Sequence, residues 1–261
     1  MKIPLYHVDA FTSSVFSGNP AAVCLLDEWI DDALLQSIAA ENNLSETAFL
    51  VHNGNRFDLR WFTPTTEVAL CGHATLASAF VLFTCRGWTE DTICFQTRES
   101  GQLRVSRRDD MLELDFPARP ARPTSPPVGL DAMLGVAAKQ VLDSAEDLLV
   151  RLEDEEAVLQ ARPDFAALTT LAWRGIIITA PGRRSDFVSR FFGPAVGVAE
   201  DPVTGSAHCV LTPYWSAVLN KKELYALQIS RRGGELWCQE AGERVKIRGE
   251  AALYLQGAIT I

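Results

Sequence analysis

A pattern that recurs along the chain limits its possible folds more than any other feature of the sequence. The segment Arg60-Trp61-Phe62-Thr63-Pro64 is matched by Arg190-Phe191-Phe192-Gly193-Pro194, at an offset of 190 − 60 = 130 residues. After a slip of three residues, Gly72-His73-Ala74 is matched by Gly205-Ser206-Ala207, at 205 − 72 = 133. Each copy predicts a strand, a loop with a proline, and a glycine that begins an apolar helix. Coincidence between two ordinary strand–loop–helix units is the alternative, and we favour a duplicated α+β domain.

Alternation of apolar and polar residues predicts strands on both sides of the chain's midpoint. These strands are expected at about residues 57–61, 112–116, 176–178, 236–239, 244–248 and 252–255. Glycines separate the last three closely, which favours hairpins and antiparallel sheet over a regular βαβ alternation. Helices are expected at about 31–43, 72–86 and 205–219, the last with Pro213 as a kink.

A proline-rich segment, 117–127, is too rich in proline for the centre of a sheet and is predicted to be a linker. The expected division is a first α+β domain at 1–117 and a second at 118–261, with the last strand free to cross to the first domain. Because binding sites commonly lie between domains, we expect the two glycine loops to face a shared cleft.

Charge and composition exclude several classes of protein. Lysine and arginine number 24 against 33 acidic residues, a net charge of −9, which argues against binding to nucleic acid. The sequence holds no apolar run of 18 residues and does not start like a signal peptide, so no membrane span and no export are expected. The six cysteines show no framework spacing. We therefore expect a cytoplasmic protein with free thiols.

Three segments bring polar and titratable groups to a strand end or a helix start. They are Asn43-Leu44-Ser45-Glu46-Thr47, Cys71-Gly72-His73-Ala74-Thr75, and Glu200-Asp201-Pro202-Val203-Thr204-Gly205-Ser206-Ala207-His208. A helix start offers unpaired N–H groups and a partial positive charge, and glycine lets a ligand approach the backbone. Two such starts in one cleft are suited to hold a small acid and to stabilise its enolate.

These segments, together with three further motifs, resemble the phenazine-biosynthesis isomerase-like (PhzF-like) family over nearly the whole chain. The further motifs are Asp9-Ala10-Phe11, Phe16-Ser17-Gly18-Asn19-Pro20-Ala21-Ala22-Val23, and Ser230-Arg231-Arg232-Gly233-Gly234-Glu235. The resemblance implies the diaminopimelate-epimerase-like fold: two similar α+β domains related by a pseudo-twofold axis, each a mostly antiparallel sheet around a central helix. It also implies a cofactor-free proton transfer and a homodimer.

The resemblance also implies roles for individual residues. Glu46 would be the general acid/base that moves a proton between carbons of a small carboxylate-bearing metabolite, such as a dihydro-hydroxyanthranilate. His73 and Asp201 would orient the substrate or relay protons. The residues expected to bind the substrate are Asn19, Gly72, Ala74, Gly205 and Ser206.

Cys71 is the basis of the main competing hypothesis. Amino-acid racemases of the same fold use two opposed thiols, and Cys71-Gly72-His73 is similar to one of their thiol segments. The partner thiol should lie just before Thr204-Gly205, but the sequence there is Pro202-Val203. A one-base shift by Glu46 is therefore favoured, and a non-catalytic small-molecule-binding protein on the same scaffold is a further alternative.

No metal and no cofactor are expected. Cys71 and His73 are two residues apart and His208 is followed directly by Cys209, spacings that fit no zinc template. The chain also lacks a glycine-rich nucleotide loop of either the dinucleotide-binding or the P-loop type.

Overall fold

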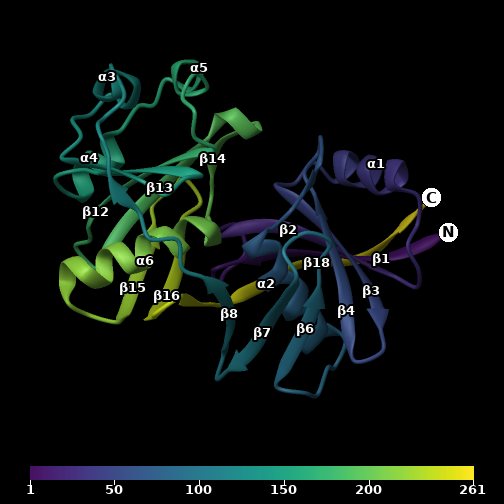
Figure 1. Cartoon of the computed structure of the whole chain (residues 1–261). Helices are drawn as coiled ribbons and strands as arrows, with labels where there is room; N and C mark the ends of the chain where they lie inside the picture. The colour runs from purple at the N-terminus through teal and green to yellow at the C-terminus, as the bar shows by residue number, and fades with distance from the viewer. The chain divides into compact units, whose positions relative to one another are not determined.

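The structure is a computed structural model that describes residues 1–261. The chain forms two compact units, of which the first comprises Met1–Asp115 with Arg248–Ile261 and the second comprises Phe116–Ile247. The end of the chain belongs to the first unit because its last strand pairs antiparallel with the first strand, from Lys2↔Thr260 to Ala10↔Ala251. Residues 248–261 of the predicted second domain therefore lie in the first unit, and the two chain ends lie side by side (Figure 1).

The first unit contains most of the elements before residue 117 and the last strand. Its strands are β1 (Lys2–Ala10), β2 (Asn19–Leu26), β3 (Glu46–Asn53), β4 (Arg56–Phe62), β5 (Glu67–Val68), β6 (Thr92–Gln96), β7 (Gln102–Arg108), β8 (Met111–Pro117) and β18 (Ala251–Thr260). Its helices are α1 (Asp32–Asn42) and α2 (Gly72–Phe80), and α2 continues as a π-helical turn over Val81–Cys85. The predicted helix at 72–86 is thus α-helical only in its first part.

The sheet of the first unit is mostly antiparallel and surrounds α2. Strand pairs β1–β2, β3–β4 and β6–β7 are antiparallel, whereas β2–β3 and β4–β6 are parallel. Helix α2 packs against β1, β2, β3, β7 and β18 (Figure 1). All its residues from His73 to Ala79 are buried, as expected for a helix enclosed by a sheet.

The second unit has the same kinds of elements. Its strands are β9 (Arg122–Pro123), β10 (Gln140–Asp143), β11 (Asp147–Arg151), β12 (Gly175–Pro181), β13 (Phe187–Gly193), β14 (Val198–Asp201), β15 (Glu223–Gln228), β16 (Gly234–Ala241) and β17 (Arg244–Gly249). Its helices are α3 (Leu130–Leu134), α4 (Glu155–Gln160), α5 (Phe165–Leu168), a 3₁₀ turn at Pro194–Val196, and α6 (Gly205–Leu219). Pro213 lies inside α6.

The succession of strand pairs in the first unit is repeated in the second. Pairs β10–β11, β12–β13 and β15–β16 are antiparallel, whereas β11–β12 and β13–β15 are parallel. Helix α6 packs against β11, β15 and β16 and takes the place of α2. The repeated sequence pattern thus lies on repeated structure, which supports the predicted duplication.

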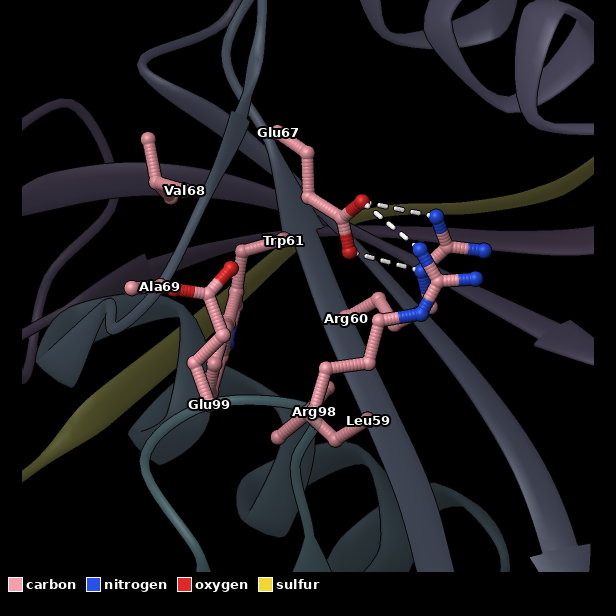
Figure 2. Close-up of a pocket in the computed structure, with 8 residues that line it drawn as sticks. All are labelled: Leu59, Arg60, Trp61, Glu67, Val68, Ala69, Arg98 and Glu99. Carbon is pink, nitrogen blue, oxygen red and sulfur yellow. Dashed lines mark hydrogen bonds and ion pairs between the residues drawn. The ribbon is translucent and has the colours of Figure 1, made fainter.

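Each unit contains an arginine, buried in the first unit and half-buried in the second, that joins two strands through a glutamate. Arg60 on β4 donates from Nε and Nη2 to the carboxylate of Glu67 on β5, at 2.7 Å for each bond. Figure 2 shows the guanidinium groups of Arg60 and Arg98 both facing that carboxylate. In the second unit Arg190 on β13 donates in the same way to Glu200 on β14, at 2.7 and 3.0 Å. Both ion pairs lie at equivalent positions of the repeat.

The proline-rich segment, 117–127, is hydrogen-bonded to the rest of the second unit. The backbone N–H of Ala118 donates to the Glu243 carbonyl at 2.8 Å, and that of Arg119 donates to the Cys209 carbonyl at 2.9 Å. Strand β9, inside the segment, pairs with β10. The predicted linker is therefore ordered, because its few N–H groups find partners on the second unit.

All six cysteines are free thiols, as expected from their spacing. No helix in the structure is long and apolar enough to cross a membrane.

Candidate functional site

Glu46 and His73 face each other in the first unit. Glu46 is the first residue of β3 and His73 is the second residue of α2. The distance from Glu46 Oε2 to His73 Nε2 is 3.0 Å, and the two side chains are 15% and 5% exposed. The contact between Oε2 and Nε2 is an ion pair, and it is the one polar contact of the Glu46 side chain. Oε1 is left without a donor from the protein.

Asn19 holds the other side of the imidazole. It is the first residue of β2, paired with Ala10 of β1, and it is fully buried. Its Nδ2 lies 3.1 Å from His73 Nδ1. An amide N–H can only donate, so Nδ1 accepts and Nε2 carries the proton that faces Glu46. Turned by 180°, the same amide would offer its oxygen to a doubly protonated ring, so Asn19 suits both charge states of His73.

The Cys71 thiol lies against the same ring, with Sγ 3.6 Å from Nδ1. Burial raises the pKa of Cys71 to about 11, and the negative charge of Glu46 adds to that rise. The thiol is therefore protonated near neutral pH. A thiolate, the form that acts as a base or nucleophile, is disfavoured at this position.

The charge of His73 depends on its neighbours. Burial by itself lowers the pKa of His73, whereas Cys71 and Glu46 raise it, and the net value lies well above the ordinary one. Because the Cys71 thiol is protonated, Glu46 supplies the negative charge that favours the imidazolium. We therefore describe the pair as a carboxylate beside a protonated imidazole, with the Asn19 amide turned so that its oxygen accepts from Nδ1.

Both central helices begin without a side-chain cap. Cys71 precedes α2 and Thr204 precedes α6, and neither side chain accepts a hydrogen bond from its own helix start. In contrast, Asp31, Asp154 and Asp164 cap α1, α4 and α5 through their carboxylates. The first N–H groups of α2 and α6 are thus left available for an acceptor of another kind.

The predicted site residues of the second unit surround the start of α6. Asp201 ends β14 and accepts a hydrogen bond from Thr204 Oγ1 at 2.5 Å. The buried Gln228 braces this loop, because its Oε1 accepts from the Thr204 N–H and its Nε2 donates to the Asp201 carbonyl. Gly205 and Ser206 follow as the first two residues of α6.

The structure thus groups the predicted residues in two sets. Asn19, Glu46 and Cys71 all contact His73 in the first unit, and Gly72 and Ala74 belong to the same helix turn. Asp201, Gly205 and Ser206 lie together in the second unit. Their functional roles stay predictions.

Arg174, which bonds to Ser206, and Asp147, which bonds to Arg174, were absent from the prediction. Arg174 Nη2 donates to Ser206 Oγ at 3.2 Å and also to the carboxylate of Asp147 at 2.7 Å. Arg174 directly precedes β12, two residues before its buried run of isoleucines, and a charged residue at such a place is the one signal that the sequence offered.

The first-unit set also resembles a metal site in its spacing. The potential ligand atoms of Glu46, Cys71 and His73 all lie within 4.8 Å of one another. Only these three groups converge there, whereas a structural zinc site has four protein ligands. That the protein needs no metal stays a prediction.

Comparison with known proteins identifies relatives over the full length of the chain. Residues 8–257 match the family model described as phenazine biosynthesis-like protein. An uncharacterized isomerase of Pseudomonas aeruginosa is 56% identical over 261 residues, with 100% of both chains covered. A PhzF-family crystal structure from Enterococcus faecalis is 46% identical, with a TM-score of 0.97 and 100% of both chains covered.

More distant structures share the fold alone. A hydroxyproline epimerase from Agrobacterium vitis is 9% identical, with a TM-score of 0.60 over 99% of this chain and 92% of that one. The predicted family and the predicted diaminopimelate-epimerase-like fold are both confirmed by these comparisons together with the two sheets described above.

We predict that His73 titrates above its ordinary pKa of about 6.5, and that Glu46→Gln lowers its midpoint because the facing anion is removed. Nuclear magnetic resonance titration of the imidazole signals measures both. Because the folded-state pKa is raised, the His73 proton stabilises the fold fully below about pH 6.5, and this contribution is lost as the pH rises through the folded-state pKa.

His208 and an exposed glutamate supply the controls. Burial lowers the pKa of His208 to about 4, so its signal should stay constant over the same range. Glu41→Gln makes the same chemical change on the exposed surface of α1 and should leave His73 unchanged. An unchanged His73 midpoint in Glu46→Gln would contradict the charge pairing.

Proposed function

The chain belongs to the phenazine biosynthesis-like family, and we propose that it is a cofactor-independent isomerase in which Glu46 moves a proton between two carbons of one substrate. Isomerase activity is the level that its relatives' names support. Glu46 as the acid/base, and a small metabolite with a carboxylate and an acidic C–H as the substrate, are the finer parts of the proposal.

One observation carries the assignment of the base. The Glu46 side chain is 15% exposed, and its one polar contact is the ion pair of Oε2 with His73 Nε2 at 3.0 Å. Oε1 therefore retains its lone pairs for a proton from carbon. The largely buried surroundings also keep bulk water from competing for the same oxygen.

The proposed reaction balances within one turnover. Glu46 as carboxylate takes a proton from a substrate carbon, and the electron pair that is left spreads into the adjoining conjugated system. The carboxylic acid then returns the proton to a second carbon of that system. No electrons leave or enter, so neither an oxidant nor a bound cofactor is required.

His73 supports this step electrostatically. A protonated imidazole beside Glu46 offsets the negative charge that develops on the substrate while its proton is on Glu46. Asn19 fixes the ring through Nδ1, so Nε2 stays directed at the carboxylate. His73 is thus proposed as the electrostatic partner of the base.

The uncapped helix starts suit the substrate carboxylate. Free N–H groups at the first turn of a helix bind anions. In α2 and α6 these groups donate no hydrogen bond to the side chain of the residue before the helix. Gly72 and Ala74 at α2, and Gly205, Ser206 and Asp201 at α6, are the proposed binding residues. The cytoplasmic location and the homodimer also stay predictions.

A cysteine-dependent racemase is the second candidate, and the structure gives it less support. Cys71 is buried with a pKa raised to about 11, which opposes its use as a base. The position equivalent to Cys71 in the repeat is Thr204 (204 − 71 = 133), which has no thiol. A two-thiol mechanism therefore lacks its second base.

We predict that Glu46→Gln lowers the rate of C–H exchange about 10²–10⁴-fold, because the amide keeps the shape of the side chain but cannot accept the proton. The assay incubates the protein in deuterated water with a panel of small unsaturated carboxylic acids, including a dihydro-hydroxyanthranilate. Mass spectrometry then measures deuterium in the substrate and the product.

The exposed Glu41→Gln variant is the matched control and should keep full activity. A folded Glu46→Gln protein with unimpaired turnover would exclude Glu46 as the base. If the unaltered protein exchanges no C–H of any acid in the panel but binds one of them, a non-catalytic binding function is favoured instead.

A second variant separates the two enzyme hypotheses. Cys71→Ser should leave measurable exchange, because its thiol is not the base, whereas a thiol racemase would lose activity entirely. Cys94→Ser, on the half-buried face of β6, controls for the loss of a thiol as such. Complete inactivity of a folded Cys71→Ser protein would contradict the one-base mechanism.

A further inference from the structure

The duplicated units place different chemistry at equivalent strand positions. In the first unit Ala21 of β2 pairs with Glu46 of β3, and in the second unit Asp147 of β11 pairs with Gly175 of β12, in the same parallel arrangement. Gly175 therefore takes the place of Glu46. A Cβ atom at Gly175 would collide with the ring of Phe191, so the second unit cannot carry a carboxylate side chain there.

The positively charged side chain of Arg174 lies beside Gly175, the position that corresponds to Glu46. Arg174 donates from Nε to Asp147 Oδ1 at 3.0 Å and from Nη2 to Asp147 Oδ2 at 2.7 Å. Asp147 is fully buried, and the guanidinium also lies over the Phe191 ring at 5.6 Å from its centre. A planar guanidinium held at two edges and one face has a single orientation.

The same guanidinium reaches the start of α6. Arg174 Nη2 donates to Ser206 Oγ at 3.2 Å, and Ser206 takes the place of His73 in the repeat (206 − 73 = 133). Within the second unit this is the one polar contact of the Ser206 hydroxyl, which is half-buried. An arginine never accepts a hydrogen bond, so Ser206 Oγ accepts from Arg174 and must direct its own O–H elsewhere.

We propose that Arg174, anchored by Asp147, is a positioning residue that fixes Ser206 as a hydroxyl donor to the carboxylate of the ligand at the start of α6. This inference rests on the proposed function, in which Ser206 binds the substrate carboxylate. The first unit then carries the proton-transfer pair, Glu46 and His73. The second carries a donor pair, Arg174 and Ser206, at the corresponding place.

Charge balance shows how Arg174 acts. Its positive charge is paired with the buried Asp147, so it adds little net charge for an approaching anion. Its contribution is the direction it imposes on the Ser206 hydroxyl. The expected effect is that of one hydrogen bond, about 5- to 10-fold in the affinity for a carboxylate.

The test is a titration of the full-length protein with anthranilate, a stable aromatic carboxylate, followed through the backbone amide signals of Gly205 and Ser206. The unaltered protein should show saturable shifts of both signals. Arg174→Lys retains a charge against Asp147 but has no planar fork to reach Ser206, and it should weaken binding about 5- to 10-fold. Ser206→Ala should weaken it to a similar extent.

The double variant distinguishes positioning from a general structural role. If Arg174 acts through Ser206, adding Arg174→Lys to Ser206→Ala causes no further loss of affinity. If Arg174 had only a structural role, Arg174→Lys would lower the affinity by the same factor with Ser206 present and with Ser206→Ala. It would also lower the melting temperature. Lys221→Met removes a cation paired with Asp186 beyond the opposite end of α6 and should change nothing.

Several outcomes would overturn the inference. They are the absence of shifts at Gly205 and Ser206 in the unaltered protein, an Arg174→Lys protein that binds anthranilate as tightly as the unaltered one, and independent losses that multiply in the double variant. If Arg174→Lys fails to fold, the double variant Arg174→Gln/Asp147→Asn is used in its place, because it leaves no buried charge unpaired.

Failure of this inference is distinguishable from failure of the proposed function. Binding of anthranilate involves no proton transfer, so the titration does not depend on which residue is the base. Turnover that persists in Glu46→Gln would reject the proton-transfer role. The titration alone decides the role of Arg174.

Discussion

Two partly buried arginine–glutamate pairs join neighbouring strands shortly before the two central helices begin. The Arg60 side chain is 3% exposed and donates two hydrogen bonds to Glu67, which lies four residues before Cys71. Arg190 donates two hydrogen bonds to Glu200, which is next to Asp201. Removing either glutamate would take away the bidentate partner of the guanidinium, although Arg60 would keep its bond to Asp32. Because His73 and Asp201 follow these glutamates closely, the two pairs help to position the starts of both helices, which have no side-chain cap.

The duplicated framework explains how one fold supplies two kinds of chemistry. Strand order, strand direction and the arginine–glutamate pairs are the same in both units. The residues beside the helix starts differ: a carboxylate and an imidazole in the first unit, a guanidinium and a hydroxyl in the second. A rigid repeated scaffold thus allows the side chains at one place in each copy to diverge without disturbing the strands that position them.

The sequence predicted the repeat, six of the eighteen strands and the three longest helices, because these depend on local periodicity and on residues close in the chain. Glu46 came from the family resemblance, since a glutamate between a helix and a strand carries no local mark of burial. The pairing of Asn19 with His73 depends on sheet register, which periodicity does not determine. Arg174 and its two partners come from three separate segments, and such convergence becomes visible only in the folded chain.

The central claim is that one carboxylate, Glu46, both removes and returns the proton. It is tested most directly with a substrate that carries deuterium at the carbon to be deprotonated, followed by analysis of the product's stereochemistry and label. A single base predicts that the proton arrives on the same face from which it left, and that some deuterium is carried over from the first carbon to the second. Delivery to the opposite face with label only from solvent would require a second base and would contradict the account.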